Sequence, residues 1–189
     1  MKILIASDIH GSSYYAEKLY EIYEQSNPDY VFLLGDYLYH GPQNDLPREY
    51  NVQKTITILN KMKSKIIGLK GDCDSEADLK KLLFDIDYGF RLLNVDGIKI
   101  YLTHGHINNI LPKIDHDSIL ITGNTHIYNM EEKYINPGSI SLPLDDAPHT
   151  YIMYNDHKFY LYDIDKKKLL KKLTIKNITT DRKYINPYS

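Results

Sequence analysis

The feature that most constrains the fold is an alternation of apolar runs and helix-like stretches along residues 1–84. Apolar runs with β-branched residues, typical of buried strands, cover Lys2–Ser7, Tyr30–Leu34 and Lys65–Leu69. Apolar residues recur at helical spacing over Ser12–Gln25, Tyr50–Lys63 and Ser75–Phe84. Strand–helix–strand–helix–strand order predicts a parallel α/β sheet. Between them, Gly35–Arg48 is expected to form a loop because it contains Gly41-Pro42 and Pro47.

The second half of the chain is dominated by strand-like runs. They cover Gly97–Thr103, Ser118–Thr122, Lys133–Asn136, Thr150–Tyr154, Lys158–Tyr162 and Lys168–Ile175. Asn155-Asp156-His157 is expected to form a hairpin turn. Since helical spacing is sparse here, we expect a largely antiparallel half, and two sheets packed face to face with helices outside.

Length, charge and cysteine content narrow the class of protein. The 189 residues predict one domain over residues 1–189, with polar residues 179–189 as a flexible tail. With a net charge of −2, the chain lacks the strongly basic charge that is typical of nucleic-acid-binding proteins. A single cysteine excludes an intrachain disulfide, and apolar runs are too short for a membrane span or signal peptide. We therefore expect a soluble, cytoplasmic protein.

Polar residues follow five strand-like runs at the point where each run ends. They are Asp8 and His10, Asp36, Asp72 with Cys73 and Asp74, His104 and His106, and Asn124 and His126. Ligands bind outside the carboxyl ends of strands in open α/β sheets. Oxygen and imidazole ligands suit ions such as Mn²⁺, Fe²⁺ or Zn²⁺, and three neighbouring carboxylates would repel without a cation.

Each of these residues also has a simpler interpretation when it is taken alone. His10 or His126 could be a hydrogen-bonded loop histidine, and Asp72 or Asp74 could cap the following helix. Cys73 could be a small packing residue. The order and placement of all five groups together favour a metal site.

The motifs Asp8-Ile9-His10, Gly35-Asp36, Gly71-Asp72-Cys73-Asp74, His104-Gly105-His106 and Gly123-Asn124-Thr125-His126 occur in this order. With Asn136-Pro137-Gly138-Ser139, they make the chain resemble the calcineurin-like metallophosphoesterases over about residues 1–145, most closely a bacterial phosphodiesterase branch. The resemblance implies an α/β fold, a four-layer α-β-β-α sandwich of two mixed sheets, and two divalent metal ions.

If the ligand positions of the family are carried over to this chain, the first ion would be held by Asp8, His10, Asp36 and His126. The second would be held by Asp36 as a bridge, Asp72, His104 and Asn124. The family has Asn where this chain has Asp72, and His where it has Asn124. The resulting ligand set is harder, which favours Mn²⁺ or Mg²⁺ over Zn²⁺; Fe²⁺ and Ni²⁺ stay open.

The resemblance implies hydrolysis of a small phosphoester, with a hydroxide held between the two ions attacking a phosphodiester. Besides Asp36, His106 and Cys73 are candidate catalytic residues, as proton donors to the leaving group. A basic residue that often follows the Asn-Pro-Gly-Ser segment is missing at Ser141-Leu142-Pro143. Two alternatives stay open: a phosphomonoesterase, and a non-catalytic scaffold like the retromer subunit of this fold. A homo-oligomer also stays open.

Overall fold

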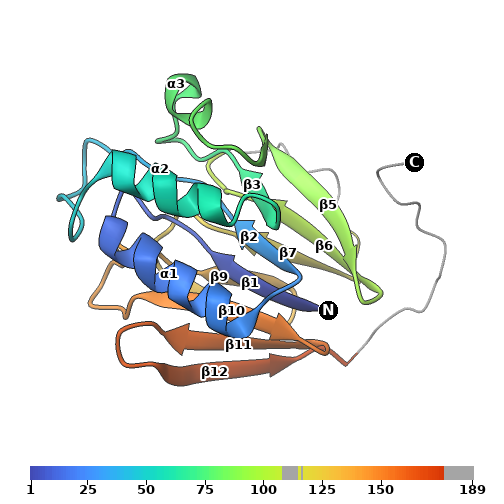
Figure 1. Cartoon of the computed structure of the whole chain (residues 1–189). Coiled ribbons are helices and arrows are strands. Elements are labelled where there is room, and N and C mark those ends of the chain that lie inside the picture. Colours follow the sequence, from blue (N-terminus) through green and yellow to red (C-terminus); the bar gives the residue numbers. More distant parts are fainter. Residues whose placement is uncertain (108–114, 116, 177–189) are drawn as a thin grey trace.

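The chain forms two mixed β-sheets packed against each other, with helices over the outer face of the larger sheet (Figure 1). The computed structural model describes residues 1–107, 115 and 117–176. The α/β class and the two mixed sheets predicted from the sequence are confirmed.

The larger sheet has seven strands in the order β12-β11-β10-β1-β2-β3-β4. Its parallel half consists of β1 (Lys2–Ala6), β2 (Tyr30–Leu33), β3 (Ile66–Leu69) and β4 (Asp85–Asp87). Its antiparallel half consists of β10 (Thr150–Asn155), β11 (Lys158–Asp163) and β12 (Lys168–Thr174). The predicted hairpin turn is confirmed: Asp156 and His157 have φ of 49° and 58°, as in type I′ turns.

Helices α1 (Ser13–Ser26) and α2 (Val52–Lys61) lie side by side on this sheet (Figure 1). Each is preceded by an N-cap residue whose side chain accepts a backbone N–H. Ser12 accepts from Tyr15, and Asn51 accepts from Lys54. Because α1 and α2 connect β1 to β2 and β2 to β3, they return the chain to the same edge and make these strands parallel.

The third predicted helix is much shorter than expected. α3 covers only Glu76–Leu79, and Ser75 caps it. The prediction of a helix up to Phe84 is wrong because the chain turns after Leu79 and pairs Asp85–Asp87 with β3. This edge strand is too short to show a period-two pattern in the sequence.

The smaller sheet has the order β5-β6-β7-β9-β8. Its strands are β5 (Phe90–Val95), β6 (Ile98–Thr103), β7 (Ser118–Thr122), β8 (Tyr128–Met130) and β9 (Tyr134–Pro137). β6, β7 and β9 are parallel, so the expectation of a largely antiparallel second half is wrong for this sheet. β4, β5 and β8 were not predicted. Consequently the carboxyl ends of parallel strands from both sheets are available to one site.

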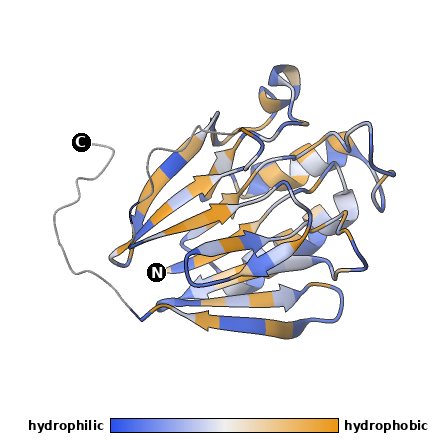
Figure 2. Cartoon of the chain, turned by 180° about the vertical axis from the view of Figure 1, so that it is seen from behind, coloured by the Kyte–Doolittle hydropathy of each residue, from blue (hydrophilic) through white to orange (hydrophobic). Residues whose placement is uncertain are grey.

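Apolar side chains form two core layers, one on each face of the larger sheet. Ile3 and Ile5 pack between the sheets, whereas Leu4 and Ala6 pack toward the helices. A strand buried on both faces explains the continuous apolar run at the start of the chain. In Figure 2 the strands accordingly carry much of the hydrophobic colour.

Two expectations fall partly on residues outside the described ones. The resemblance implies helices over the smaller sheet, but the β6–β7 connection includes residues 108–114 and 116, which are outside the described residues. The expected tail at residues 179–189 is also outside the described residues. Among the described helices, the longest of which has 14 residues, none has the length and apolar character of a membrane span.

Candidate metal centre

The candidate residues gather where strands of the two sheets end together. Asp8 and His10 follow β1, Asp36 follows β2, and Asp72 follows β3 in the larger sheet. From the smaller sheet, His104 and His106 follow β6, and Asn124 and His126 follow β7. The strand-end placement predicted from the sequence is thus observed.

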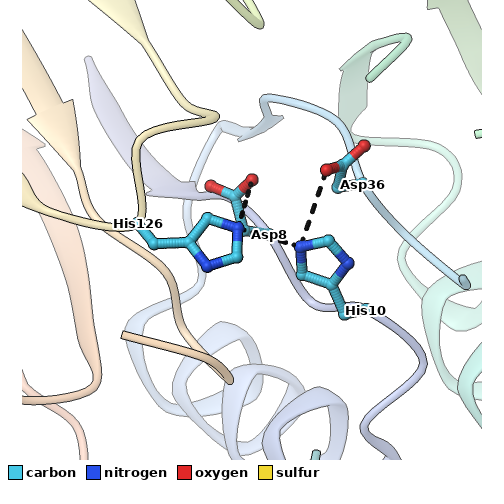
Figure 3. A group of neighbouring side chains, drawn as sticks. All are labelled: Asp8, His10, Asp36 and His126. Atoms are coloured by element: carbon cyan, nitrogen blue, oxygen red, sulfur yellow. Dashed lines mark hydrogen bonds and ion pairs between the residues drawn. The ribbon is translucent and has the colours of Figure 1, made fainter. Parts of the chain in front are cut away.

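A first group of four buried side chains consists of Asp8, His10, Asp36 and His126. One potential ligand atom from each lies within 4.8 Å of those of the other three. Figure 3 shows the two imidazoles and two carboxylates converging from three separate segments of the chain. Mixed carboxylate and imidazole donors in this spacing are suited to a divalent ion.

Backbone carbonyls orient three of the histidines. Nδ1 of His10 contacts the Tyr39 oxygen at 2.7 Å, Nδ1 of His126 the Leu142 oxygen at 2.6 Å, and Nδ1 of His104 the Leu34 oxygen at 2.5 Å. Because a carbonyl only accepts, each Nδ1 carries a proton and donates it. In the neutral rings, Nε2 therefore presents a lone pair to the site.

This orientation of the histidine rings is favourable only if a positive charge lies among the four side chains of the first group. Nε2 of His10 and Nε2 of His126 lie 3.0 Å apart, so two lone pairs face each other. Among the residues that the structure describes, buried Oδ1 of Asp8 has no hydrogen-bond partner, and it lies 3.6 Å from Nε2 of His126. A metal ion would satisfy all three atoms, so the residues present fit the ion that the fold implies.

A second group adjoins the first and comprises Asp72, His104 and His106, again within 4.8 Å. Nε2 of His104 lies 3.0 Å from Oδ1 of Asp72. Oδ2 of Asp36 lies 3.5 Å from Nε2 of His10 and 3.6 Å from Nε2 of His104. Asp36 thus stands between the groups, where the sequence analysis placed a bridge.

The charges in this cluster shift the pKa values strongly. Burial raises the pKa of Asp8 to about 6. Burial also opposes ionisation of Asp36, but hydrogen bonding and charge from His104 lower its pKa overall. Burial would lower the pKa of His104, but Asp36 and Asp72 raise it to about 11. Without an ion, a proton on His104 therefore supplies positive charge that the carboxylates require.

The backbone is left-handed at five candidate site residues. Their φ values are 57° for Asp8, 48° for His10, 54° for Asp36, 69° for Asn124 and 59° for His126. Such conformations are uncommon outside glycine and concentrate at functional sites, where surrounding contacts hold them. Here the chain turns sharply just past each strand, which directs the side chains into one cluster.

Two glycines allow the backbone to approach neighbouring polar side chains closely. A Cβ at Gly71 would lie 2.0 Å from Oδ1 of Asp36, and a Cβ at Gly123 would lie 2.1 Å from Oγ of Ser7. No side chain fits at such distances, so these positions require glycine.

Several supporting residues were missed or given other roles by the sequence analysis. The Asp74 carboxylate does not cap α3; it accepts backbone N–H groups of Asp36, Tyr37 and Gly71, each at 2.8 Å. Hydroxyls of Ser139 and Ser141 both donate to the Asp8 carbonyl, at 2.8 and 2.9 Å. The Asn-Pro-Gly-Ser motif was a sequence signal for Ser139, whereas Ser141 lies two residues beyond this motif.

Asn136 in the same motif holds the loop before His126. Its Nδ2 donates to the Gly123 carbonyl at 2.8 Å, and its Oδ1 accepts the Gly138 N–H at 2.8 Å. Asn136 thus ties the loop before His126 to the turn at Gly138.

Cys73 and Asn124 contact the first group through their backbone. The Cys73 N–H donates to Oδ1 of Asp36 at 3.0 Å, and the Asn124 N–H donates to Oδ2 of Asp8 at 3.3 Å. Burial and the neighbouring carboxylates raise the pKa of the Cys73 thiol to about 12. The thiol is therefore a weak acid, and the main contribution of Cys73 here is its N–H.

Two mixed sheets and buried carboxylate–imidazole groups at their joined strand ends define a metal-dependent hydrolase of the phosphoesterase type. The family model described as "Calcineurin-like phosphoesterase superfamily domain" matches residues 1–158 of this chain. The chain therefore belongs to this superfamily.

Among curated relatives, the chain is 33% identical to phosphodiesterase YfcE of Escherichia coli K12, over 93% of this chain and 98% of YfcE. It is 30% identical to phosphodiesterase MJ0936 of Methanocaldococcus jannaschii, over 85% and 96% of the two chains. The solved structure of YfcE, a phosphoesterase from E. coli, superimposes with a TM-score of 0.86 at 32% identity, covering 93% of this chain and all of that one.

Proposed function

We propose that this chain hydrolyses phosphodiesters with two divalent ions, and that Mn²⁺ is preferred. Asp8, His10, Asp36 and His126 would hold the first ion; Asp36, Asp72, His104 and Asn124 would hold the second. The observation that carries the proposal is the position of Asp36 Oδ2, 3.5 Å from one cluster's imidazole and 3.6 Å from the other's. One carboxylate can thus be shared.

When bound, two such ions lower the pKa of a water molecule and neutralise phosphoryl charge. The protein's contribution is to hold the donors in place before substrate arrives. Three backbone carbonyls fix the histidine rings, and Asp74 and the two serines fix the carboxylate-bearing loops. The Asp8 side chain is 0% exposed whereas that of Asp72 is 49% exposed, so we infer that substrate approaches from the Asp72 side.

The leaving group receives little help from protein acids in this proposal. Burial and the nearby charge of His104 lower the pKa of His106, so His106 is largely neutral near pH 7. The Cys73 thiol, with its pKa of about 12, is a poor donor. Rates should therefore fall steeply as the pKa of the leaving group rises, and aryl esters should be the best model substrates.

Charge favours a diester over a monoester. The carboxylates of Asp8, Asp36 and Asp72 against two divalent ions leave one positive charge, which matches a monoanionic diester better than a dianionic monoester. The names of YfcE and MJ0936 as phosphodiesterases point the same way. A third carboxylate also makes the ligand set harder, which favours Mn²⁺ over Zn²⁺.

The test compares kcat/KM for bis-p-nitrophenyl phosphate and p-nitrophenyl phosphate, with Mn²⁺ and with a chelator. We expect the diester to be preferred and the chelator to abolish activity. A clear monoester preference would overturn the diester assignment and favour a phosphomonoesterase. Activity that survives the chelator would overturn the metal-dependent mechanism, and inactivity with both ions bound would favour a scaffold.

A further inference from the structure

The second metal group contains a histidine to which the ligand set carried over from the family gives no role. One ring nitrogen of His106 lies within 4.8 Å of the ligand atoms of Asp72 and His104. The family resemblance supplies an imidazole at position 124 instead, where this chain has Asn124. The second group therefore lacks one expected imidazole and has another beside it.

The backbone explains how two histidines of one strand end face the same group. Gly105, between them, has a φ of +103°, a conformation that favours glycine. The ring centroids of His104 and His106 lie 5.3 Å apart. Both rings are thus presented to Asp72 from a single turn after β6.

The hydrogen bonding of His106 differs from that of the other site histidines. His10, His104 and His126 each donate Nδ1 to a backbone carbonyl. In the described part of the chain, Nδ1 of His106 is buried and has no hydrogen-bond partner. The His106 ring thus has a nitrogen within 4.8 Å of the ligand atoms of Asp72 and His104, and its Nδ1 is not held by a described backbone carbonyl. An imidazole placed in this way beside a carboxylate and a second imidazole is suited to an ion.

We propose that His106 is a ligand of the second metal ion and takes the place of the imidazole that Asn124 does not provide. This inference rests on the proposed two-ion site, and it assigns His106 to ion binding rather than to proton donation. The second ion would then have Asp36, Asp72, His104 and His106 as its main ligands, with the Asn124 amide as a weaker oxygen donor.

The test is a double-mutant cycle on Mn²⁺ binding, with free Mn²⁺ followed by electron paramagnetic resonance. The variants are His106→Ala, Asn124→His and the double variant, and His157→Ala in the β10–β11 hairpin is the matched control. We expect His106→Ala to weaken the second site at least about tenfold and to leave the first site unchanged. In the Asn124→His background the same change should cost less than about threefold, because position 124 now supplies the imidazole.

Three results would count against the proposal in different ways. Equal weakening in both backgrounds would show that His106 does not take the place of an imidazole at position 124, and unchanged affinity in His106→Ala would show that His106 binds no ion. A wild-type chain that takes up a single Mn²⁺ would overturn the two-ion site itself. Unchanged first-site affinity in every variant reports that the fold is intact.

Discussion

The carboxylate of Asp74 holds the backbone of Asp36: its buried Oδ2 accepts the Asp36 N–H at 2.8 Å, just beyond the ends of β2 and β3. The same carboxylate accepts two further N–H groups, so one buried side chain fixes the loop that presents Asp36, the proposed bridging residue. A carboxylate accepts at both oxygens, whereas an amide accepts at only one.

Asp74→Asn should therefore destabilise the protein by about 1–3 kcal/mol, because an amide NH₂ would face a buried N–H. It should also weaken both metal sites, since Asp36 contacts both groups. Urea unfolding and Mn²⁺ titration measure the two effects. The exposed Asp45 serves for a matched Asp45→Asn control, and equal stability of both variants would contradict a special role for Asp74.

Gly71→Ala should abolish both metal sites through steric contact alone. The new Cβ would lie 2.0 Å from Oδ1 and 2.5 Å from the backbone N of Asp36, and neither can move without breaking the contacts from Cys73 and Asp74. Metal analysis after dialysis against Mn²⁺ provides the measurement. Gly89→Ala, between β4 and β5, is the control and should retain both ions.

Asp36 and Asp72 should differ in how many ions depend on them. Asp36→Asn should reduce binding at both sites, because Oδ2 lies within 3.6 Å of an imidazole of each group. Asp72→Asn should weaken only the second site. Calorimetric titration with Mn²⁺ separates these outcomes, and an Asp36→Asn variant that binds two ions tightly would contradict the shared carboxylate.

His149 should make stability depend on pH. Its ring stacks on Tyr15 with centroids 4.2 Å apart, its Nδ1 donates to the Ile140 carbonyl, and burial lowers its pKa below the usual 6.5. The unfolded chain then takes up a proton before the folded chain does. This contribution to stability is present above pH 6.5 and is lost as pH falls below it.

A His149→Phe variant keeps an aromatic ring on Tyr15 but cannot titrate. The difference in unfolding free energy between wild type and His149→Phe should therefore become less favourable to the wild type as pH falls from 7.5 to 5.5. Urea unfolding at several pH values, with chelator in all samples, gives this difference. A difference that is independent of pH would contradict the shift assigned to His149.

The sequence predicted the parts of this fold that carry long or periodic signals. The apolar run at Lys2–Ser7 predicted β1, and the helical spacing of α1 and α2 predicted the parallel strands they connect. Short edge strands such as β4 and β8 have three residues each and carry no readable period. The direction of β9 depends on the connection from β7, which is a property of the whole topology.

The residues of the candidate site could be predicted from the sequence, whereas most of the groups that orient them could not. Asp8, His10, Asp36 and His126 come together as expected, because strand ends meet at one edge. The carbonyls of Tyr39 and Leu142 that orient the imidazoles belong to backbone that any sequence supplies. Asp74 was visible but ambiguous, since an Asp before a helix more often caps it.

The left-handed backbone at Asp8, His10, Asp36, Asn124 and His126 restricts how this site can change over generations. At such φ values Gly, Asn, Asp and His are tolerated, while β-branched residues are strongly disfavoured. Substitutions at these positions are therefore largely restricted to these four residue types, and the side chains of three of them, Asn, Asp and His, can bind an ion. Asn124, where the family has His, is one such step. The left-handed backbone of these loops thus favours substitutions to residues that can still act as metal ligands.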